Sequence, residues 1–551
     1  MTAPSAPVLV VGGGPVGLTV ANLLAAREVP VVLLERHAST SDEAKAISLD
    51  DESLRALAAA DLAEKVSDIV VPGTGTRYYD RHGRVLFHAR GPQGHRLGYP
   101  FKNQFAQPEL ERVLLDSLTS RPRADVRLAT ELASLAERPD RVRVTVRPTG
   151  QDTTIELDVS WVLGCDGGRS RVRELCGIDM AGVSHQELWL VVDTVGDPHD
   201  QRYGMHYGTP RRPTVVVPGR DGRCRYEFLL HPGEGDKHTT PDFTTIRRLI
   251  APYREVTADQ VERATTYTFN ALIADRWRDG RCLLLGDAAH MMPPFAGQGL
   301  NSGIRDAANL AWKVADVWHG RTGDQLLDTY EQERRPHAAA MVRFSERLGE
   351  IVMTTDTRRA MARDIATRTL LHTPLGRRYL TQMRFRPPSR HRRGLVVGSH
   401  PLVGTQLPQP RVLLAPTLRT CLLDDALGND WALLGVDVVD ADWRGFGTAA
   451  WRDLPCTIRT VDVVLGDRLP RPVAPRIALA DADGQLEAAL GSARGRFVLV
   501  RPDHYIAAVV RRHELPELAA GLQQALAAPR RRLRPSTERS TRSSAQAPQH
   551  F

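Results

Sequence analysis

Three glycines near the N-terminus have the spacing of a phosphate-binding turn. Gly12, Gly14 and Gly17 follow the apolar run 8–11 and open an Ala/Leu-rich stretch that reads as a helix. The first glycine of such a unit allows a tight turn, the second lets a pyrophosphate approach the backbone, and the third lets helix and strand pack closely. Glu35 ends the next apolar run, where an acid can accept hydrogen bonds from a ribose. The motif predicts a dinucleotide site for FAD or NAD(H), and the acid argues against the 2′-phosphate of NADP(H).

A second glycine-rich cluster, at 286–302, decides between these two cofactors. Asp287 follows an apolar run, where a carboxylate can bind a ribityl or ribose hydroxyl, and Pro293 with its neighbouring proline would form a rigid wall. Gly297 and Gly299 then open a second helix, whose free amides would face an anion. Reduced flavin carries negative charge around N1 and the C2 oxygen, so a helix N-terminus aimed there favours its reduction. The two clusters together predict FAD.

The order of these motifs resembles that of a known enzyme family. Three segments match the class A flavoprotein aromatic hydroxylases, the p-hydroxybenzoate hydroxylase-like group: GGGPVG at 12–17, CDGGRSRVR at 165–173, and 286–314. Within that group the chain is most similar to the 3-(3-hydroxyphenyl)propionate hydroxylases, through the segments 46–55, 77–80, 103–111 and 223–228. The segment 497–503 resembles the thioredoxin-like domain of the phenol hydroxylase branch.

The resemblance implies an FAD-dependent monooxygenase that hydroxylates a phenolic ring with NAD(P)H and O2 through a flavin C4a-hydroperoxide. NAD(P)H would bind transiently, because the chain has one dinucleotide fingerprint only. The implied substrate is similar to 3-(3-hydroxyphenyl)propionate. Three alternatives stay open: the same chemistry on a polycyclic polyketide or other natural product, a flavin reductase or dehydrogenase without oxygenation, and a redox-silent flavin- or NAD-binding protein.

The resemblance also implies site residues. The cofactor-binding set consists of the glycine turns, the acids that follow strands, and their neighbours: Gly12, Gly14, Gly17, Glu35, Arg36, Lys45, Gln107, Asp166, Gly286, Asp287, Gly299, Leu300 and Asn301. Lys45 stands where the group usually has arginine, and it loses the bidentate fork of that residue. Pro293, Gly297, Gly299 and His290 are expected in the catalytic region. His290 could act as a general base, although a structural role in its turn is favoured, because sequence cannot establish hydrogen-bond reach. His206, Tyr207, Tyr226 and His231 fall on the expected substrate sheet, where any of them could touch the phenol.

These segments predict an α/β fold: a Rossmann-like FAD-binding domain with an inserted mixed β-sheet substrate domain and a C-terminal thioredoxin-like domain. The expected parts are an FAD-binding part at 1–180 with a strand insert near 76–105, a substrate-binding sheet at 181–275, and a second FAD-binding segment with helices at 276–395. A thioredoxin-like domain at 396–528 and a disordered basic tail at 529–551 would follow.

Charge and composition argue against several other classes. The net charge is +8, but residues 529–551 hold six arginines and one acid, so most of the basicity is local and nucleic acid is not expected as a partner. No apolar run is long enough to cross a bilayer, and no secretory signal precedes the first strand, so we expect a cytoplasmic protein without a membrane partner. The six scattered cysteines are expected to be reduced and to bind no metal. A homodimer is a further expectation.

Overall fold

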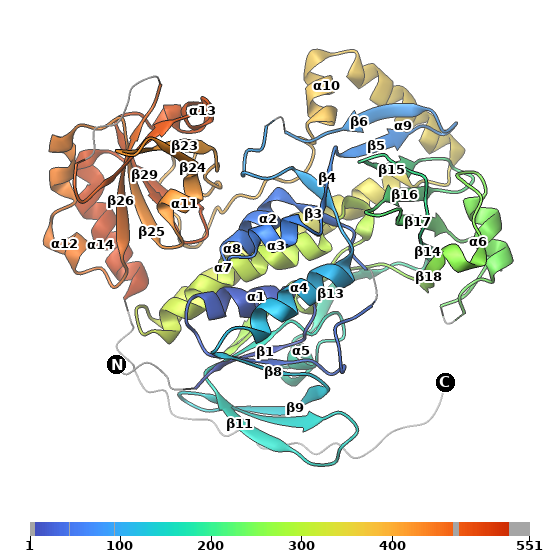
Figure 1. The fold of residues 1–551 in the computed structure, drawn as a ribbon, viewed down its shortest axis with the longest axis horizontal. Coiled ribbons are helices and arrows are strands. Elements are labelled where there is room, and N and C mark those ends of the chain that lie inside the picture. Colours follow the sequence, from blue (N-terminus) through green and yellow to red (C-terminus); the bar gives the residue numbers. More distant parts are fainter. Residues whose placement is uncertain (1–5, 43–44, 93, 238, 467–472, 528–551) are drawn as a thin grey trace.

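The computed structural model describes residues 6–42, 45–92, 94–237, 239–466 and 473–527 (Figure 1). The predicted basic tail at 529–551 lies outside the described residues. Among the described helices, none combines the length and the apolar character needed to span a bilayer.

The glycine turns at Gly12 and Gly286 follow strands of a largely parallel sheet. Its strand order is β20-β21-β12-β1-β2-β8, and all neighbours are parallel except β20 and β21. Every side chain of β1, β2 and β12 is buried, as expected for parallel strands covered on both faces. Helices α1, α7 and α4 pack together beside this sheet. The bounds are β1 Val8–Val11, β2 Val31–Leu34, β8 Ala124–Arg127, β12 Trp161–Gly164, β20 Arg278–Asp279, β21 Cys282–Leu284, α1 Pro15–Ala26, α4 Gln107–Thr119 and α7 Gly299–Trp318.

A second sheet, which we call the inserted sheet, faces the ends of these parallel strands. Its order is β18-β14-β17-β16-β15-β5-β6, and it is antiparallel except where β15 meets β5. It thus joins the segment 76–89 to the segment 189–267. The bounds are β5 Thr76–Tyr79, β6 Val85–Ala89, β14 Trp189–Thr194, β15 Gly204–Tyr207, β16 Thr214–Pro218, β17 Cys224–Leu229 and β18 Val261–Tyr267.

Three smaller sheets complete this half of the molecule. β7 pairs with β3 and β4 rather than with β5 and β6, so the strands near 76–105 divide between two sheets. The other two have the orders β11-β10-β9 and β13-β19-β22. The bounds are β3 Ser48–Asp50, β4 Val71–Gly73, β7 Lys102–Gln104, β9 Thr130–Glu137, β10 Val142–Pro148, β11 Ile155–Val159, β13 Met180–Ser184, β19 Asn270–Ala274 and β22 His290–Met291.

The C-terminal part forms a separate α/β unit, drawn in orange and red in Figure 1. Its seven-stranded sheet has the order β24-β23-β27-β26-β25-β28-β29. The strands β25, β26 and β27 are parallel; β28 runs antiparallel to β25 and forms an antiparallel hairpin with β29. The bounds are β23 Arg411–Ala415, β24 Arg419–Leu422, β25 Trp431–Val436, β26 Ile458–Val464, β27 Ile477–Asp481, β28 Arg496–Val500, β29 Ile506–Val510 and the last helix, α14, Leu515–Leu526.

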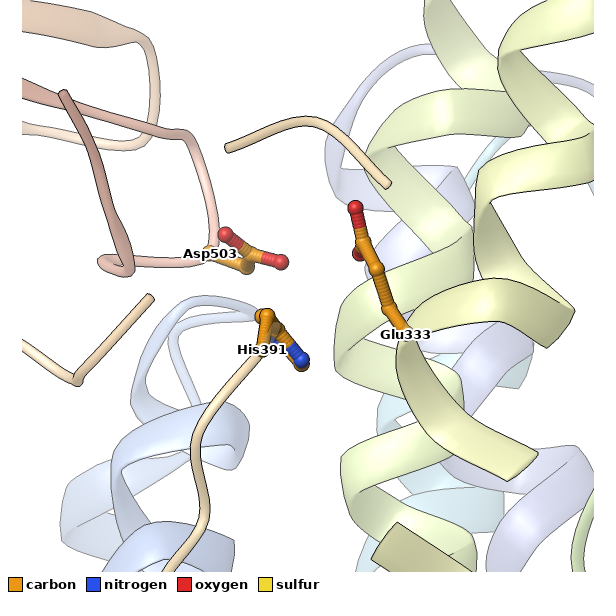
Figure 2. Close-up of side chains that lie close together, drawn as sticks. All are labelled: Glu333, His391 and Asp503. Atoms are coloured by element: carbon orange, nitrogen blue, oxygen red, sulfur yellow. The ribbon is translucent and has the colours of Figure 1, made fainter. Parts of the chain in front are cut away.

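A buried ion-pair cluster ties this unit to the helices of the first half. Glu333 on α8 (Asp328–Val352) accepts hydrogen bonds from Arg501 at 2.7 and 2.8 Å and from Lys313 Nζ at 2.7 Å. Figure 2 shows that Asp503 and His391 lie beside Glu333. Arg501 also donates to Asp503 at 2.6 Å, and burial lowers the pKa of His391 to about 3. The carboxylates are already neutralised by buried cations, so this group is a buried ion-pair contact between the C-terminal unit and the helices α7 and α8.

Replacing Glu333 by alanine should lower the free energy of unfolding by about 3–5 kcal/mol, because Lys313 and Arg501 would remain buried without this carboxylate. Urea unfolding measures the effect. Asp125→Ala, which removes an exposed partner of Arg127, is the control and should change stability by less than about 0.5 kcal/mol. Equal stabilities for the two variants would contradict the assigned role of the cluster.

Candidate functional site

A cavity of about 1300 Å³ lies between the ends of the parallel strands and the inserted sheet. It gathers residues that are far apart in the sequence, including eleven of the predicted site residues. These are Gly12, Gly14, Glu35, Arg36, Lys45, Gln107, Asp166, Asp287, Gly297, Gly299 and Leu300. The other five, Gly17, Gly286, His290, Pro293 and Asn301, do not line it.

The three glycines of the first turn have different surroundings. Gly12 has φ +107°, and a Cβ there would lie 2.5 Å from the carbonyl oxygen of Cys165. A Cβ on Gly17 would lie 1.9 Å from the carbonyl oxygen of Gly12, so this glycine allows the helix to pack on the turn. Gly14 has no atom within 4 Å of its Cβ position and faces the cavity. Helix α1 starts directly after Gly14 without a side-chain cap, which leaves its amides available to an anion.

Glu35 and Gln107 hold the backbone around this turn. Glu35 accepts hydrogen bonds from the backbone amides of Gly13 at 2.7 Å and His37 at 2.9 Å. Gln107 is the first residue of α4; its Oε1 accepts from the amide of Ala46 at 2.7 Å, next to the exposed Lys45. Both side chains line the cavity and therefore shape its wall.

Asp166 caps a helix. Its carboxylate accepts hydrogen bonds from Ser170 Oγ at 2.5 Å and from the amides of Arg171 at 2.6 Å and Val172 at 3.1 Å, at the start of α5 (Arg171–Leu175). Burial raises the pKa of Asp166. These bonds occupy the carboxylate, so a cofactor would meet chiefly the backbone of Asp166 and Gly167.

Asp287 differs, because no hydrogen bond within the described part of the chain reaches its carboxylate. It follows β21 in a turn that Gly286 permits with φ +59°. Asp287 lines the cavity, and desolvation by the surrounding protein raises its pKa, against the opposing charges of His290 and Lys45. A hydroxyl-rich ligand would supply the missing donors.

The second helix N-terminus also opens into the cavity. Helix α7 begins after Gln298 with no side-chain cap and no acid in its first turn, and Gly297 has φ +61°. Asn301 is fully buried; it donates to the carbonyl oxygens of Ser48 at 2.9 Å and Gly297 at 2.8 Å. Asn301 also accepts from the amide of Asp50 at 2.9 Å. Its side chain thus holds the turn and β3 together.

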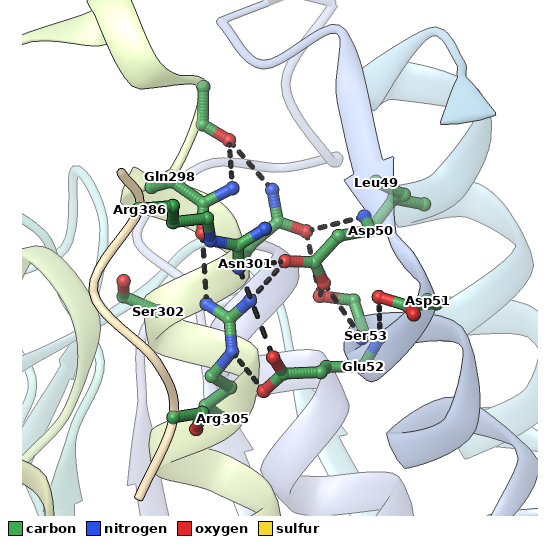
Figure 3. A network of polar contacts seen from close by, with 12 residues as sticks. Leu49, Asp50, Asp51, Glu52, Ser53, Gln298, Asn301, Ser302, Arg305 and Arg386 are labelled. Atoms are coloured by element: carbon green, nitrogen blue, oxygen red, sulfur yellow. Dashed lines mark hydrogen bonds and ion pairs between the residues drawn. The ribbon is translucent and has the colours of Figure 1, made fainter. Parts of the chain in front are cut away.

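A network of charged side chains lies next to Asn301 (Figure 3). Arg305 forms ion pairs with Asp50 and with Glu52, the latter at 2.6 Å, and Arg386 pairs with Asp50 at 2.9 Å. Burial and the two neighbouring acids raise the pKa of Asp51 to about 7. Arg386 also lines the cavity, so the network connects its wall to α7.

His290 is not placed for catalysis. It is completely buried outside the cavity, and its Nε2 lies 2.7 Å from Asp306 Oδ2. Asp306 also accepts from Arg334 at 2.9 Å. The prediction of a catalytic His290 is therefore not supported, because the ring has no access to an occupant. Pro293 likewise lies behind the wall, which its neighbour Pro294 forms.

A row of side chains from four adjacent strands covers the far wall. Glu227 on β17 pairs in register with Val215 on β16, which pairs with His206 on β15, which pairs with Tyr78 on β5. Directly paired residues share one face of a sheet, and all four line the cavity. Of the four predicted candidates on this sheet, only His206 lies here. Tyr207, Tyr226 and His231 are absent from the lining, and Tyr226 donates to Asp197 at 2.7 Å.

Two titratable groups of this row have opposite pKa shifts. Burial raises the pKa of Glu227 to about 7. Burial, and then the charge of Lys102, lower the pKa of His206 to about 3. Within the described residues no hydrogen bond reaches the Glu227 carboxylate, which is 8% exposed. Sequence reasoning missed Glu227 and Lys102. The sequence shows how side chains alternate between the two faces along one strand, but it does not show which residues of distant strands lie side by side.

Residues 5–345 match the family model described as FAD binding domain. The chain belongs to this FAD-binding family. The cofactor of the protein is therefore FAD. Residues 404–525 match a second model, the HcaD C-terminal domain.

Known relatives cover nearly the whole chain. A 3-(3-hydroxy-phenyl)propionate/3-hydroxycinnamic acid hydroxylase of Mycobacterium avium (strain 104) is 36% identical, over 94% of this chain and 92% of its own length. A second relative, from Burkholderia vietnamiensis (strain G4 / LMG 22486), is named 3-(3-hydroxy-phenyl)propionate/3-hydroxycinnamic acid hydroxylase 2. It is 35% identical, over 91% of this chain and 93% of its own length. Among solved structures, the anhydrotetracycline hydroxylase OxyS from Streptomyces rimosus is 26% identical with a TM-score of 0.71, covering 95% of this chain and 99% of its own. The flavin-dependent monooxygenase PieE has a TM-score of 0.78 at 22% identity and covers 94% of this chain and 98% of its own, which shows the shared fold.

Proposed function

We propose that this protein is an FAD-dependent monooxygenase that hydroxylates a phenolic ring carrying a short carboxylate chain, with NAD(P)H and O2 as co-substrates. The observation that carries the proposal is the continuity of one cavity from the glycine turn at Gly12 to the polar row at Glu227. The names of the relatives, which are hydroxylases of 3-(3-hydroxy-phenyl)propionate, support the same substrate class.

The described residues fit FAD. The amides at the start of α1 suit its pyrophosphate, Glu35 suits the ribose, and Asp287 suits a ribityl hydroxyl. The uncapped start of α7 suits the part of the flavin that becomes negative on reduction. When bound, FAD supplies electron transfer from NAD(P)H and the activation of O2.

The inserted sheet would hold the phenol. Val215 and Val217 give the far wall an apolar centre against which a ring can pack, and Phe344, Leu348 and Met383 line the cavity as well. Oxygen transfer to the ring needs an electron-rich phenol, so a group must accept the hydroxyl proton. Glu227 is that group in our proposal, because a base works best when its pKa lies near the operating pH. His206, with a pKa near 3, is a much weaker base.

We further propose the domain organisation expected from the sequence, including a thioredoxin-like C-terminal domain at 396–528. Support comes from the central parallel strands β25, β26 and β27, from the antiparallel β28–β29 hairpin, and from helix α14. Its cysteines Cys421 and Cys456 are far apart in the sequence, so a dithiol motif is absent from the domain.

The test of the activity uses isotopically labelled O2. We expect slow NAD(P)H oxidation until a phenol such as 3-(3-hydroxyphenyl)propionate is added, and one labelled oxygen in the product, ortho to the existing hydroxyl. Reduction without a bound substrate wastes the nicotinamide as H2O2, so coupling to occupancy is favoured. If neither simple nor polycyclic phenols accelerate NAD(P)H and O2 consumption, and no labelled product forms, the protein is a reductase. Labelled product from polycyclic phenols only would retain the chemistry and change the substrate class.

A further inference from the structure

A lysine in the cavity lacks a counter-ion among the described residues. Lys102 lies on β7, the central strand of the β3-β7-β4 sheet, and its side chain reaches across to the inserted sheet. There Nζ donates a hydrogen bond to Thr76 Oγ1 at 2.9 Å. It lies over Gly204, where a Cβ would be 3.8 Å from Nζ, so the glycine leaves room for the ammonium group.

Two other cations that line the cavity are paired with acids. Arg225 forms an ion pair with Asp193 at 2.7 Å, and Arg386 pairs with Asp50 at 2.9 Å. Asp50 is the register partner of Lys102, but its carboxylate is directed to Arg305 and Arg386. Within the described residues no carboxylate oxygen lies within 4.0 Å of Lys102 Nζ. Keeping a partly buried ammonium group without a carboxylate partner is costly, and an anionic ligand would offset that cost.

We propose that Lys102 binds the carboxylate of the aromatic substrate; this rests on the proposed function. Glu227 lies two strands away from His206, roughly 10 Å across the sheet, and about 12 Å from Gly204, which is two residues further along β15. Val215 lies between them in the row and offers an apolar surface to the ring. A phenol with a short carboxylate chain spans such a distance, with its hydroxyl at Glu227 and its carboxylate at Lys102. The opposite orientation would place two carboxylates together.

The binding should depend on pH. Burial, and then the charge of Arg386, lower the pKa of Lys102 to about 8. Arg386 and His206 are the titratable groups that interact with its charge, and burial keeps His206 neutral. The carboxylate of Asp50, the register partner of Lys102, is held by Arg305 and Arg386. Because the carboxylate needs the charged lysine, affinity should fall above pH 8 by up to about tenfold per pH unit. Lys102→Arg should remove this decline, since arginine stays charged.

The test measures ligand affinity of the FAD-loaded enzyme by perturbation of the flavin spectrum. Three ligands separate the two ends of the substrate: 3-(3-hydroxyphenyl)propionate, 3-phenylpropionate without the hydroxyl, and 3-ethylphenol without the carboxylate. We expect Lys102→Met to weaken the binding of the two carboxylates about 10- to 100-fold and the binding of 3-ethylphenol by less than about threefold. Lys102→Arg should restore most of the affinity. Lys65→Met, at an exposed lysine of the helix Ala63–Ser67, is the matched control and should change nothing.

Several outcomes would overturn the inference. An equal loss for all three ligands would show a general disturbance of the cavity, and a loss confined to the hydroxyl-bearing ligands would place the phenolate at Lys102. Unchanged affinities would exclude Lys102 from binding. Because 3-phenylpropionate reports binding without turnover, these results are independent of the labelled-oxygen experiment, and failure of one proposal can be distinguished from failure of the other.

Discussion

Replacing Gly14 by valine should give a folded protein that purifies without FAD. The Cβ position of Gly14 has no neighbour within 4 Å, so the fold tolerates a side chain there. That side chain would project into the cavity at the uncapped start of α1, where the pyrophosphate must approach the backbone. We expect FAD affinity to fall by roughly 100-fold or more. Visible flavin absorbance per mole of protein measures the occupancy.

Two further glycines give the controls. Gly521 lies exposed on α14, also with no neighbour within 4 Å, and Gly521→Val should retain normal FAD. Gly17→Val should instead reduce the yield of folded protein, because its Cβ would meet the carbonyl oxygen of Gly12. Full FAD occupancy in Gly14→Val would contradict the proposed position of the pyrophosphate.

Local sequence signals were sufficient to predict that the glycine turns and the acids after the strands lie close together. The glycine turn, Glu35 and Asp287 each follow directly on a short buried strand, so spacing alone placed them at the ends of β1, β2 and β21. Parallel strands bring their carboxyl ends to one edge, which is why residues nearly 300 positions apart line the same cavity. The family match confirms the FAD prediction.

The role of each side chain could not be predicted in the same way. Gln107, Asp166 and Asn301 were expected to contact FAD, yet their side chains bond mainly to nearby backbone amides and carbonyls. His290 was named because it follows the turn at 286–289, but its partner Asp306 lies about two helix turns inside α7. Such pairings depend on tertiary packing, which motif spacing does not contain.

The far wall of the cavity, where we propose that the substrate binds, depends on strand register and was largely missed. Thr76 and Gly204 pair across the parallel contact of β5 and β15, although 128 residues separate them. Lys102 reaches this contact from another sheet, because β7 pairs with β3 and β4 and not with the other strands of the expected insert. A lysine in a short strand is ordinarily solvated, so nothing local distinguished Lys102 from an exposed residue.

Replacing Glu227 by glutamine should lower kcat by about 100- to 10,000-fold near neutral pH while FAD content stays normal. The amide keeps the size of the side chain but cannot accept the phenolic proton. In the unmodified enzyme, kcat should rise with pH through about 7, as Glu227 loses its own proton. The variant should lack this rise. Glu262→Gln is the matched control, since Glu262 is half-exposed on β18 of the same sheet and should leave both kcat and its pH profile unchanged.

The same substitution should raise stability in alkaline buffer, which separates loss of a base from loss of structure. Folding keeps Glu227 protonated up to about pH 7, whereas the unfolded chain releases that proton near its ordinary pKa of 4.5. Burial of the charged form therefore destabilises the native state increasingly between these two values, and the cost is complete above pH 7. Glutamine has no such cost. Thermal unfolding of the two proteins should coincide below pH 4 and favour Glu227→Gln at pH 8. A variant that is less stable at pH 8, or one that retains kcat, would remove Glu227 from the proposed mechanism.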